Sequence, residues 1–134
     1  AIASRLAAEI YGLDILFESA EDDEHNTTRF LLMSATSSVP AVGGDMITSL
    51  VFQLRSLPAA LYKALGGFAT NGVNLTKLES YIRTGVAEQA QFYMDVQAHI
   101  DDPAMQNAME ELRFYCSKDE VHVLGSYPAS PSRS

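Results

Sequence analysis

Hydrophobic positions after residue 45 follow two different spacings, and the order of these spacings predicts a fold. Apolar residues at every second position predict strands at residues 46–54 and 91–100. Residues 74–82, with Leu78 and Ile82 on one face, and residues 120–128 are also interpreted as strands. Apolar residues three and four positions apart predict helices at residues 58–70 and 101–116. Strand, helix, strand, strand, helix, strand (βαββαβ) is the order of an α+β, ferredoxin-like fold, an antiparallel sheet with two helices on one face.

Residues that commonly begin and end helices stand at the expected positions. Pro58 and Pro103 suit a first helical turn, and Asp102 suits an N-cap. Asn71 and Gly72 suit the end of the first helix. The buried stripes of the two helices are predicted to be Leu61, Leu65, Phe68 and Ala69, and then Met105, Ala108, Met109, Leu112 and Cys116. Residues 83–89 contain Gly85 and are interpreted as a hairpin turn.

The sheet face away from the helices is expected to carry a mixture of side chains. The predicted registers place Val51, Tyr93, Gln97 and Val123 there, or their opposites if a register differs. Open faces and edge strands are commonly covered by a partner. We therefore predict a homodimer through residues 46–128, which could pair further into a tetramer.

The first 45 residues have a different pattern. Ile2, Leu6 and Ile10 predict a helix that stops at Gly12, followed by strands at 14–19 and 28–34. The run Phe30–Met33 is predicted to be a buried strand. One helix and two strands bury too little surface to be stable alone. Residues 1–45 are thus interpreted as the C-terminal remnant of a larger domain plus a linker, and 46–134 as a second domain; a small helical lead-in is the alternative.

Composition excludes several function classes. The 134 residues carry a net charge of −8 with nine scattered basic residues, which argues against nucleic-acid binding. No apolar run approaches the ~18 residues of a membrane span. Cys116 is the single cysteine, so no intrachain disulfide is possible, and a reducing, cytoplasmic location is expected. His25, His99 and His122 lack metal-ligand spacing, so no metal or other cofactor is predicted, and the last two are expected to point outward from strands.

Two segments could form sites, but the residues alone leave both open. Polar residues at 24–29 directly precede the apolar run, where they could make an ordinary turn or line a cleft. The segment RSLPAALYK (residues 55–63) begins a predicted helix, whose unpaired N–H groups could bind a carboxylate. The alternative is a plain helix start.

Several motifs together resemble a known family. They are TRF after HNT, LPAALYKALGGFATNGVNLTKLES, FYMDVQAH and VHVLGSYP. In this order and spacing they resemble the C-terminal part of prephenate dehydratase, and residues 46–128 resemble its ACT regulatory domain of the phenylalanine-sensing kind. The resemblance extends from the start of the chain to Pro128.

The resemblance implies an enzyme, a carbon–oxygen lyase of L-phenylalanine biosynthesis. The family converts prephenate to phenylpyruvate, water and carbon dioxide without a cofactor, in a cleft of a two-lobed α/β domain. Its catalytic motif corresponds to Thr28, Arg29 and Phe30. Arg29 would bind a substrate carboxylate, and the Thr28 hydroxyl would stabilise the departing ring oxygen. Most of the catalytic domain would precede Ala1, so this chain alone is expected to be inactive.

The resemblance also implies an allosteric site for phenylalanine or another aromatic amino acid. Its two motifs, usually Gly-Ala-Leu-Val and Glu-Ser-Arg-Pro, correspond here to residues 59–62 and 79–82. Ala59 replaces a glycine, and Tyr81-Ile82 replaces Arg-Pro. The predicted effector-binding residues are Leu57, Pro58, Ala59, Ala60, Leu61, Tyr62, Asn74, Leu75, Thr76, Leu78, Glu79 and Ser80. A stand-alone, non-catalytic amino-acid sensor is the alternative function.

Overall fold

The structure is a computed structural model of the 134-residue chain, and it describes residues 1–22, 28–36, 40, 43–82 and 90–130. Its contacts divide the chain into two compact units, residues 1–34 and residues 35–134. The predicted hairpin turn at 83–89, and His25 with its neighbours at 23–27, lie outside the described residues.

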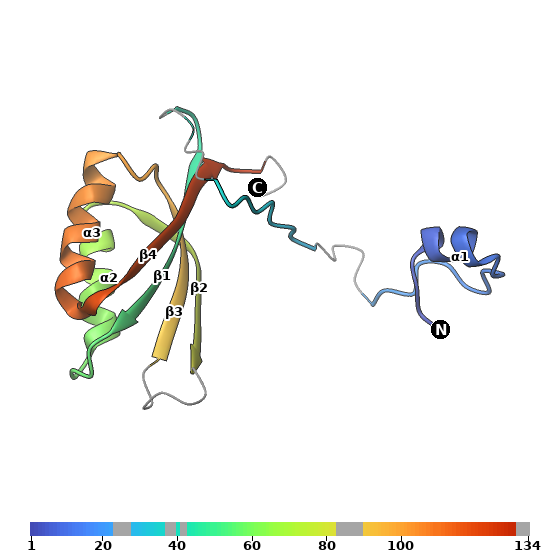
Figure 1. Cartoon of the computed structure of the whole chain (residues 1–134), viewed down its shortest axis with the longest axis horizontal. Helices are drawn as coiled ribbons and strands as arrows, with labels where there is room; N and C mark the ends of the chain where they lie inside the picture. The colour runs from blue at the N-terminus through green and yellow to red at the C-terminus, as the bar shows by residue number, and fades with distance from the viewer. Residues whose placement is uncertain (23–27, 37–39, 41–42, 83–89, 131–134) are drawn as a thin grey trace. The chain divides into compact units, whose positions relative to one another are not determined.

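The larger unit has the predicted ferredoxin-like order. Four antiparallel strands form one sheet in the order β2-β3-β1-β4. Both of its helices lie on the same side of that sheet (Figure 1). In chain order the elements are β1 (Met46–Leu54), α2 (Ala60–Thr70), β2 (Asn74–Ile82), β3 (Ala90–Gln97), α3 (Pro103–Tyr115) and β4 (Cys116–Pro128).

The core lies between the sheet and the two helices. Phe52 and Phe92 stack with their ring centroids 5.3 Å apart, and Phe68 of α2 is fully buried beside them in the same cluster. The helices approach closely at Gly67, where an added Cβ would come within 2.7 Å of the Glu111 side chain. From α3 come all of the predicted buried residues, Met105, Ala108, Met109 and Leu112, with Cys116 following at the start of β4.

Three predicted element boundaries need correction. β4 begins at Cys116, four residues before the predicted start, because α3 passes into the strand without a loop. β3 ends at Gln97, so His99 is not an outward strand residue but a buried loop residue, 1% exposed. Its Nε2 hydrogen-bonds the Pro40 carbonyl at 2.9 Å, and its Nδ1 accepts from the Asp101 N–H at 3.1 Å. A neutral imidazole satisfies both bonds. α2 begins at Ala60 rather than at Pro58.

The strand registers settle which side chains share a face. Val51 and Tyr93 are paired and face away from the helices, as predicted, but Val123 pairs with core residue Leu50 and so faces the helices. A register shift between Ser49 and Leu50 in the pairing of β1 with β4 accounts for this error. Ala69 was predicted to be buried and is exposed, because Ala60, Ala64 and Phe68 carry the buried stripe of α2.

The smaller unit contains one short helix, α1 (Arg5–Tyr11). The Ser4 side chain caps its start by accepting from the Ala7 N–H at 3.2 Å, and Gly12 ends it at φ 61°, as the sequence predicted. Arg5 and Glu18 form an exposed ion pair at 2.7 Å.

The strands predicted at 14–19 and 28–34 are wrong for the described residues, which form no strand there. Phe30 is 87% exposed and Leu32 is completely exposed, so the apolar run is not buried. A strand needs a neighbouring strand to pair its N–H and C=O groups and an apolar layer to cover its side chains. The described part of this unit supplies neither, so the hydrophobic pattern alone does not produce strands.

Candidate functional site

The segment between β1 and α2 is a tight turn with an unusual residue at its third position. The Ala60 N–H donates to the Leu57 carbonyl at 3.1 Å, which closes a β-turn with Pro58 second and Ala59 third. Ala59 has φ 55° and ψ 30°, in the left-handed region. Proline at the second position and positive φ at the third are features of a type II turn, which favours glycine at the third. We call residues 55–60 the α2 turn.

The start of α2 offers hydrogen-bond donors. Ala59 is the N-cap residue and makes no side-chain cap, since alanine has no oxygen to provide one. Lys63 N–H donates to the Ala59 carbonyl at 3.1 Å, but the N–H groups of Leu61 and Tyr62 have no hydrogen-bond partner within the described residues. Two free N–H groups at the positive end of a helix dipole suit a carboxylate. Leu57 and Tyr62 are exposed beside them and could contact an apolar ring.

The α2 turn is tied to the end of α3. The Arg55 N–H donates to the Tyr115 carbonyl at 3.0 Å. The guanidinium of Arg55 donates to the Phe114 carbonyl and lies over the Phe114 ring, 5.4 Å from the ring centroid. The Leu57 N–H in turn donates to the Arg55 carbonyl at 2.8 Å. These bonds fix the position of the turn relative to α3.

The second group of predicted effector residues lies along β2, the edge strand beyond β3. The register aligns Tyr81 with Gln91 and Gln53, near the end of β1 from which the α2 turn follows. It aligns Asn74 with Gln97, at the opposite end of the sheet. Within one copy of the chain, the fold therefore does not bring Asn74, Leu75 and Thr76 to the α2 turn. Glu79 and Ser80 lie closer to the end of the sheet from which the α2 turn follows.

The sheet face away from the helices carries a hydrogen-bonded polar cluster that the sequence did not predict. Asp95 is fully buried, and its Oδ1 accepts from the Ser49 hydroxyl at 2.5 Å and from the Tyr93 hydroxyl at 2.7 Å. The Tyr127 hydroxyl contacts Ser49 Oγ at 2.7 Å. Burial, together with the Asp95 carboxylate, raises the pKa of Tyr93. Beside the cluster, Lys77 lies over the Tyr93 ring and pairs with Glu79 at 3.1 Å.

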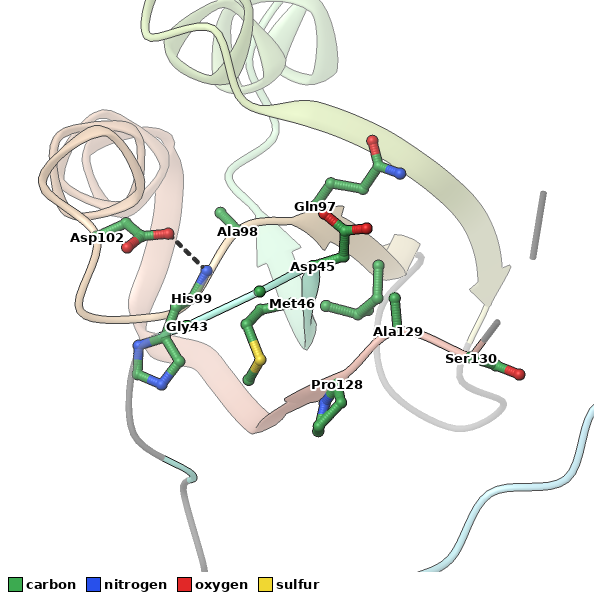
Figure 2. Close-up of a pocket in the computed structure, with 12 residues that line it drawn as sticks. Gly43, Asp45, Met46, Gln97, Ala98, His99, Asp102, Pro128, Ala129 and Ser130 are labelled. Carbon is green, nitrogen blue, oxygen red and sulfur yellow. Dashed lines mark hydrogen bonds between the residues drawn. The ribbon is translucent and has the colours of Figure 1, made fainter. Parts of the chain in front are cut away.

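A pocket of about 780 Å³ opens at the other end of the sheet, where β1 begins and β3 ends (Figure 2). Figure 2 shows Asp102 at its wall, with its carboxylate accepting from the His99 N–H at 2.8 Å. Asp45 is a second carboxylate in the lining, and none of the described lining residues is a lysine or arginine. This lining does not match a ligand carboxylate, so the α2 turn is the better candidate for the charged end of an amino acid.

The predicted catalytic residues lie in the smaller unit, in a segment without regular secondary structure. Thr28, Arg29 and Phe30 are all exposed. Because the described part of this unit has no further wall around them, the three residues do not form an enclosed site in this chain. Their catalytic roles stay predictions.

The described residues show neither a metal cluster nor a reactive thiol. They contain no group of three or more His, Cys, Asp or Glu side chains that could hold a metal ion. Burial raises the pKa of the Cys116 thiol to about 11, so little thiolate forms at neutral pH. Within the same residues, no helix is both long enough and apolar enough to cross a bilayer.

Comparison with known proteins bears on both units. Residues 1–38 match the family model of prephenate dehydratase. A bifunctional N-acyl-homoserine lactone acylase/prephenate dehydratase of Komagataeibacter europaeus is 48% identical over 99% of this chain and 47% of its own length. The resemblance to prephenate dehydratase is confirmed. A chloroplastic arogenate dehydratase/prephenate dehydratase of Arabidopsis thaliana is 38% identical over 96% of this chain and 36% of its own. The chain thus spans about half the length, or less, of these prephenate dehydratase relatives.

Solved structures agree with the fold. A prephenate dehydratase from Arthrobacter aurescens, in complex with L-Phe, is 28% identical with a TM-score of 0.62, over 70% of this chain and 30% of its own. A structure described as a quorum-quenching acylase, GqqA, is 45% identical with a TM-score of 0.66, over 73% of this chain and 50% of its own. The larger unit therefore has the ferredoxin-like fold that resemblance to a prephenate dehydratase ACT domain implied.

Three features of the larger unit were missed from the sequence. Arg55 appeared only as the first residue of the candidate segment 55–63, without a role of its own. Asp95 was not singled out, and His99 was expected to point outward from a strand. Asp95 could have been suspected, since a charged residue between the apolar residues Met94 and Val96 of a predicted strand needs hydrogen-bond donors if it is buried. The contacts of Arg55 carried no such signal, because its partners on α3 are about 60 residues away in sequence.

Proposed function

We propose that this chain is the C-terminal part of a prephenate dehydratase, which removes water and carbon dioxide from prephenate to give phenylpyruvate. The observation that carries the proposal is the 48% identity over 99% of the chain to a protein with that activity in its name. The match of residues 1–38 to the family model supports the same assignment for the smaller unit. Residues 1–45 are then the end of the catalytic domain with its linker.

In this proposal the segment at 28–30 forms one wall of the active site. Arg29 binds a carboxylate of prephenate through its planar guanidinium. Thr28 donates a hydrogen bond to the ring oxygen as it leaves with the bonding electrons, while loss of carbon dioxide makes the ring aromatic. The exposed apolar run after Arg29 would pack on the preceding part of the catalytic domain.

Turnover assays test this division of labour. The 134-residue chain should not convert prephenate, because the described residues form no enclosed site around Thr28, and the parent protein should. Phenylpyruvate formation by this chain above a no-enzyme blank would contradict the proposal, and so would an inactive parent protein.

We further propose that the larger unit is an ACT domain that senses L-phenylalanine or another aromatic amino acid and regulates the enzyme. Support comes from the similar structure of the Arthrobacter aurescens prephenate dehydratase, which is a complex with L-Phe. The ligand carboxylate would accept from the N–H groups of Leu61 and Tyr62, and its ring would lie against Leu57. Glu79 and the remaining predicted residues of β2 would come from a second copy, because within one copy β3 lies between β2 and β1, the strand that leads into the α2 turn.

Parallel calorimetric titrations with phenylalanine, tyrosine and tryptophan test the effector site. At least one should bind and raise the melting temperature, since a ligand at ~100 times its Kd stabilises the folded state by roughly 2.7 kcal/mol. Alanine at the same concentration should do little, because it lacks the ring's buried area. Absence of heat and of a thermal shift with all three aromatic amino acids would reject the sensing function.

The same arrangement requires a homodimer, which we propose forms through residues 46–128, with pairing into tetramers as a further step. Light scattering at tens of micromolar should give at least the mass of a dimer. A folded monomer at that concentration would contradict the proposal. We also propose a cytoplasmic location, supported by the single cysteine and its unreactive, buried thiol.

A second candidate function follows from the name of the 48% identical relative, which includes N-acyl-homoserine lactone acylase. Hydrolysis of an acyl amide needs a nucleophile or an activated water. Cys116, the one thiol of this chain, is buried with a pKa of about 11 and does not suit that role. The acylase candidate therefore does not use Cys116 as its nucleophile. Fatty-acid release from an N-acyl-homoserine lactone by the parent protein, unaffected by Cys116→Ala, would support it.

A non-catalytic amino-acid sensor is the competing function. It differs from the prephenate dehydratase and acylase functions because it requires a parent protein that catalyses neither reaction. A parent that binds an aromatic amino acid but converts neither prephenate nor an acyl-homoserine lactone would establish it.

A further inference from the structure

We propose that Arg55 is a positioning residue of the effector site: it holds the α2 turn against the end of α3 in the conformation that presents the α2 N–H groups. The inference rests on the proposed effector site and adds the device that sets its geometry. Arg55 lies outside the predicted effector residues, which begin at Leu57.

A continuous path of hydrogen bonds supports this role. The Tyr115 carbonyl accepts from Arg55 N–H at 3.0 Å, the Arg55 carbonyl accepts from Leu57 N–H at 2.8 Å, and the Leu57 carbonyl accepts from Ala60 N–H at 3.1 Å. Three successive bonds therefore lead from the last residue of α3 to the first residue of α2. Arg55 makes two of these three bonds, one to α3 and one to the turn, so the position of the free N–H groups of α2 depends on it.

The side chain of Arg55 fixes the same path at a second point. Its guanidinium donates to the Phe114 carbonyl, at the negative end of the α3 dipole, where a cation is favourable. Its plane also lies over the Phe114 ring, 5.4 Å from the centroid, a favourable cation–π distance. Phe114 is 70% exposed, and the edge of the neighbouring Tyr115 ring also contacts it, with the two centroids 5.1 Å apart. Backbone and side chain together hold Arg55 against two consecutive residues of α3.

The attachment matters because the turn is strained. Ala59 occupies a left-handed conformation at φ 55° that favours glycine, so the turn needs outside contacts to keep this shape. Without the Arg55 side chain, the turn should sample other conformations, and the effector would have to select the competent one. Its apparent Kd rises by the inverse of the competent fraction.

Calorimetric titration of the 134-residue chain with the aromatic amino acid that binds wild type most tightly tests the proposal. Arg55→Ala should raise Kd about tenfold, equivalent to a competent fraction of roughly one tenth. Arg55→Lys should recover only part of the loss, since lysine keeps the charge but lacks the planar fork. Arg113→Ala is the matched control, because it removes an equal charge from the last turn of α3 and leaves the α2 turn intact; it should leave Kd unchanged.

Phe114→Leu separates positioning from general stability. It removes the ring contact and keeps the backbone carbonyl, so it should raise Kd by less than Arg55→Ala. Its effect should add little to that of Arg55→Ala, which already removes the same ring contact. A purely structural role would lower the melting temperature of the ligand-free variants and leave Kd at 25 °C unchanged, which would overturn the inference. Equal losses of affinity in Arg55→Ala and Arg113→Ala would also overturn it, since they would indicate a charge effect. Failure of wild type to bind any aromatic amino acid rejects the effector site itself.

Discussion

Replacing Ala59 with glycine should make the larger unit more stable. Ala59 lies at φ 55°, where an alanine Cβ crowds the backbone, and glycine has no Cβ. The left-handed conformation costs a residue other than glycine about 1–2 kcal/mol. Glycine gives back about 0.4–1 kcal/mol, because it adds conformational freedom to the unfolded chain. The difference predicts a net gain of roughly 0.5–1 kcal/mol in the free energy of unfolding.

Thermal and urea unfolding, followed by circular dichroism, can resolve a change of this size. For a domain of about 100 residues, a gain of 0.5–1 kcal/mol corresponds to an increase of roughly 2–6 °C in melting temperature. Ala69→Gly is the matched control, since Ala69 is an exposed position inside α2. There the same substitution should lower stability by about 0.5–1 kcal/mol. Ala59→Val should also destabilise, because a branched side chain is disfavoured at positive φ.

Opposite signs for the two glycine substitutions are the result that the α2 turn requires. If Ala59→Gly lowers stability as Ala69→Gly does, Ala59 is not in the left-handed conformation. The type II turn at the start of α2, and the donor arrangement that depends on it, would then be rejected.

Three other perturbations give separate tests. In the parent enzyme, Thr28→Ala should lower kcat by about 10²-fold or more with a smaller change in KM, because the proposed hydrogen bond strengthens as the ring oxygen departs. An unchanged kcat in a prephenate assay would exclude Thr28 from the catalytic mechanism. Asp95→Ala should lower the free energy of unfolding in urea by about 2–3 kcal/mol, because the hydroxyls of Ser49 and Tyr93 lose their acceptor. Glu79→Ala removes an exposed acid and should change this free energy by under about 0.5 kcal/mol. Equal effects of the two substitutions would contradict the buried cluster. The thiol of Cys116 has a pKa of about 11 in the folded chain against 9.0 ordinarily, so the unfolded chain loses this proton first as pH rises. The free energy of unfolding, measured relative to that of Cys116→Ala, should therefore fall between about pH 9 and about pH 11, by at most about 3 kcal/mol. Parallel pH profiles for the two proteins would refute the burial of the thiol.

Sequence patterns predicted the larger unit well, because its elements are stabilised by contacts within the chain. Alternation in residues 46–54 and in the strand containing Phe92 and Met94 identified core strands whose partners are present. Gly72 marked the end of α2 through its left-handed backbone conformation. Asp102 lies at the predicted N-cap position of α3, although its side chain makes no capping bond there.

The same kind of pattern failed where the contacts are absent. Residues 28–34 have the composition of a buried strand, but within the described residues no strand pairs with them and no apolar layer covers them. Val123 was placed on the wrong face because a register shift changes which side chains align, and alternation does not reveal such a shift.

The candidate site was predicted in part. Family resemblance identified the segment that forms the α2 turn, and residue 59, where alanine replaces the family's usual glycine, has positive φ in the structure. The contact between Arg55 and Phe114 depends on how the end of β1 meets the end of α3. No local pattern contains that information, because it arises only from the packing of elements distant in sequence.

The proposal that an aromatic amino acid binds at the α2 turn is tested most directly by NMR. Amide chemical shifts of the 134-residue chain are recorded during titration with L-phenylalanine. The largest changes should occur at the N–H groups of Leu61 and Tyr62, with further changes at Glu79 and Ser80 of the second copy. L-Alanine should leave these signals in place. Saturable changes confined to the pocket around His99, or no changes with phenylalanine, tyrosine or tryptophan, would contradict an effector site at the α2 turn.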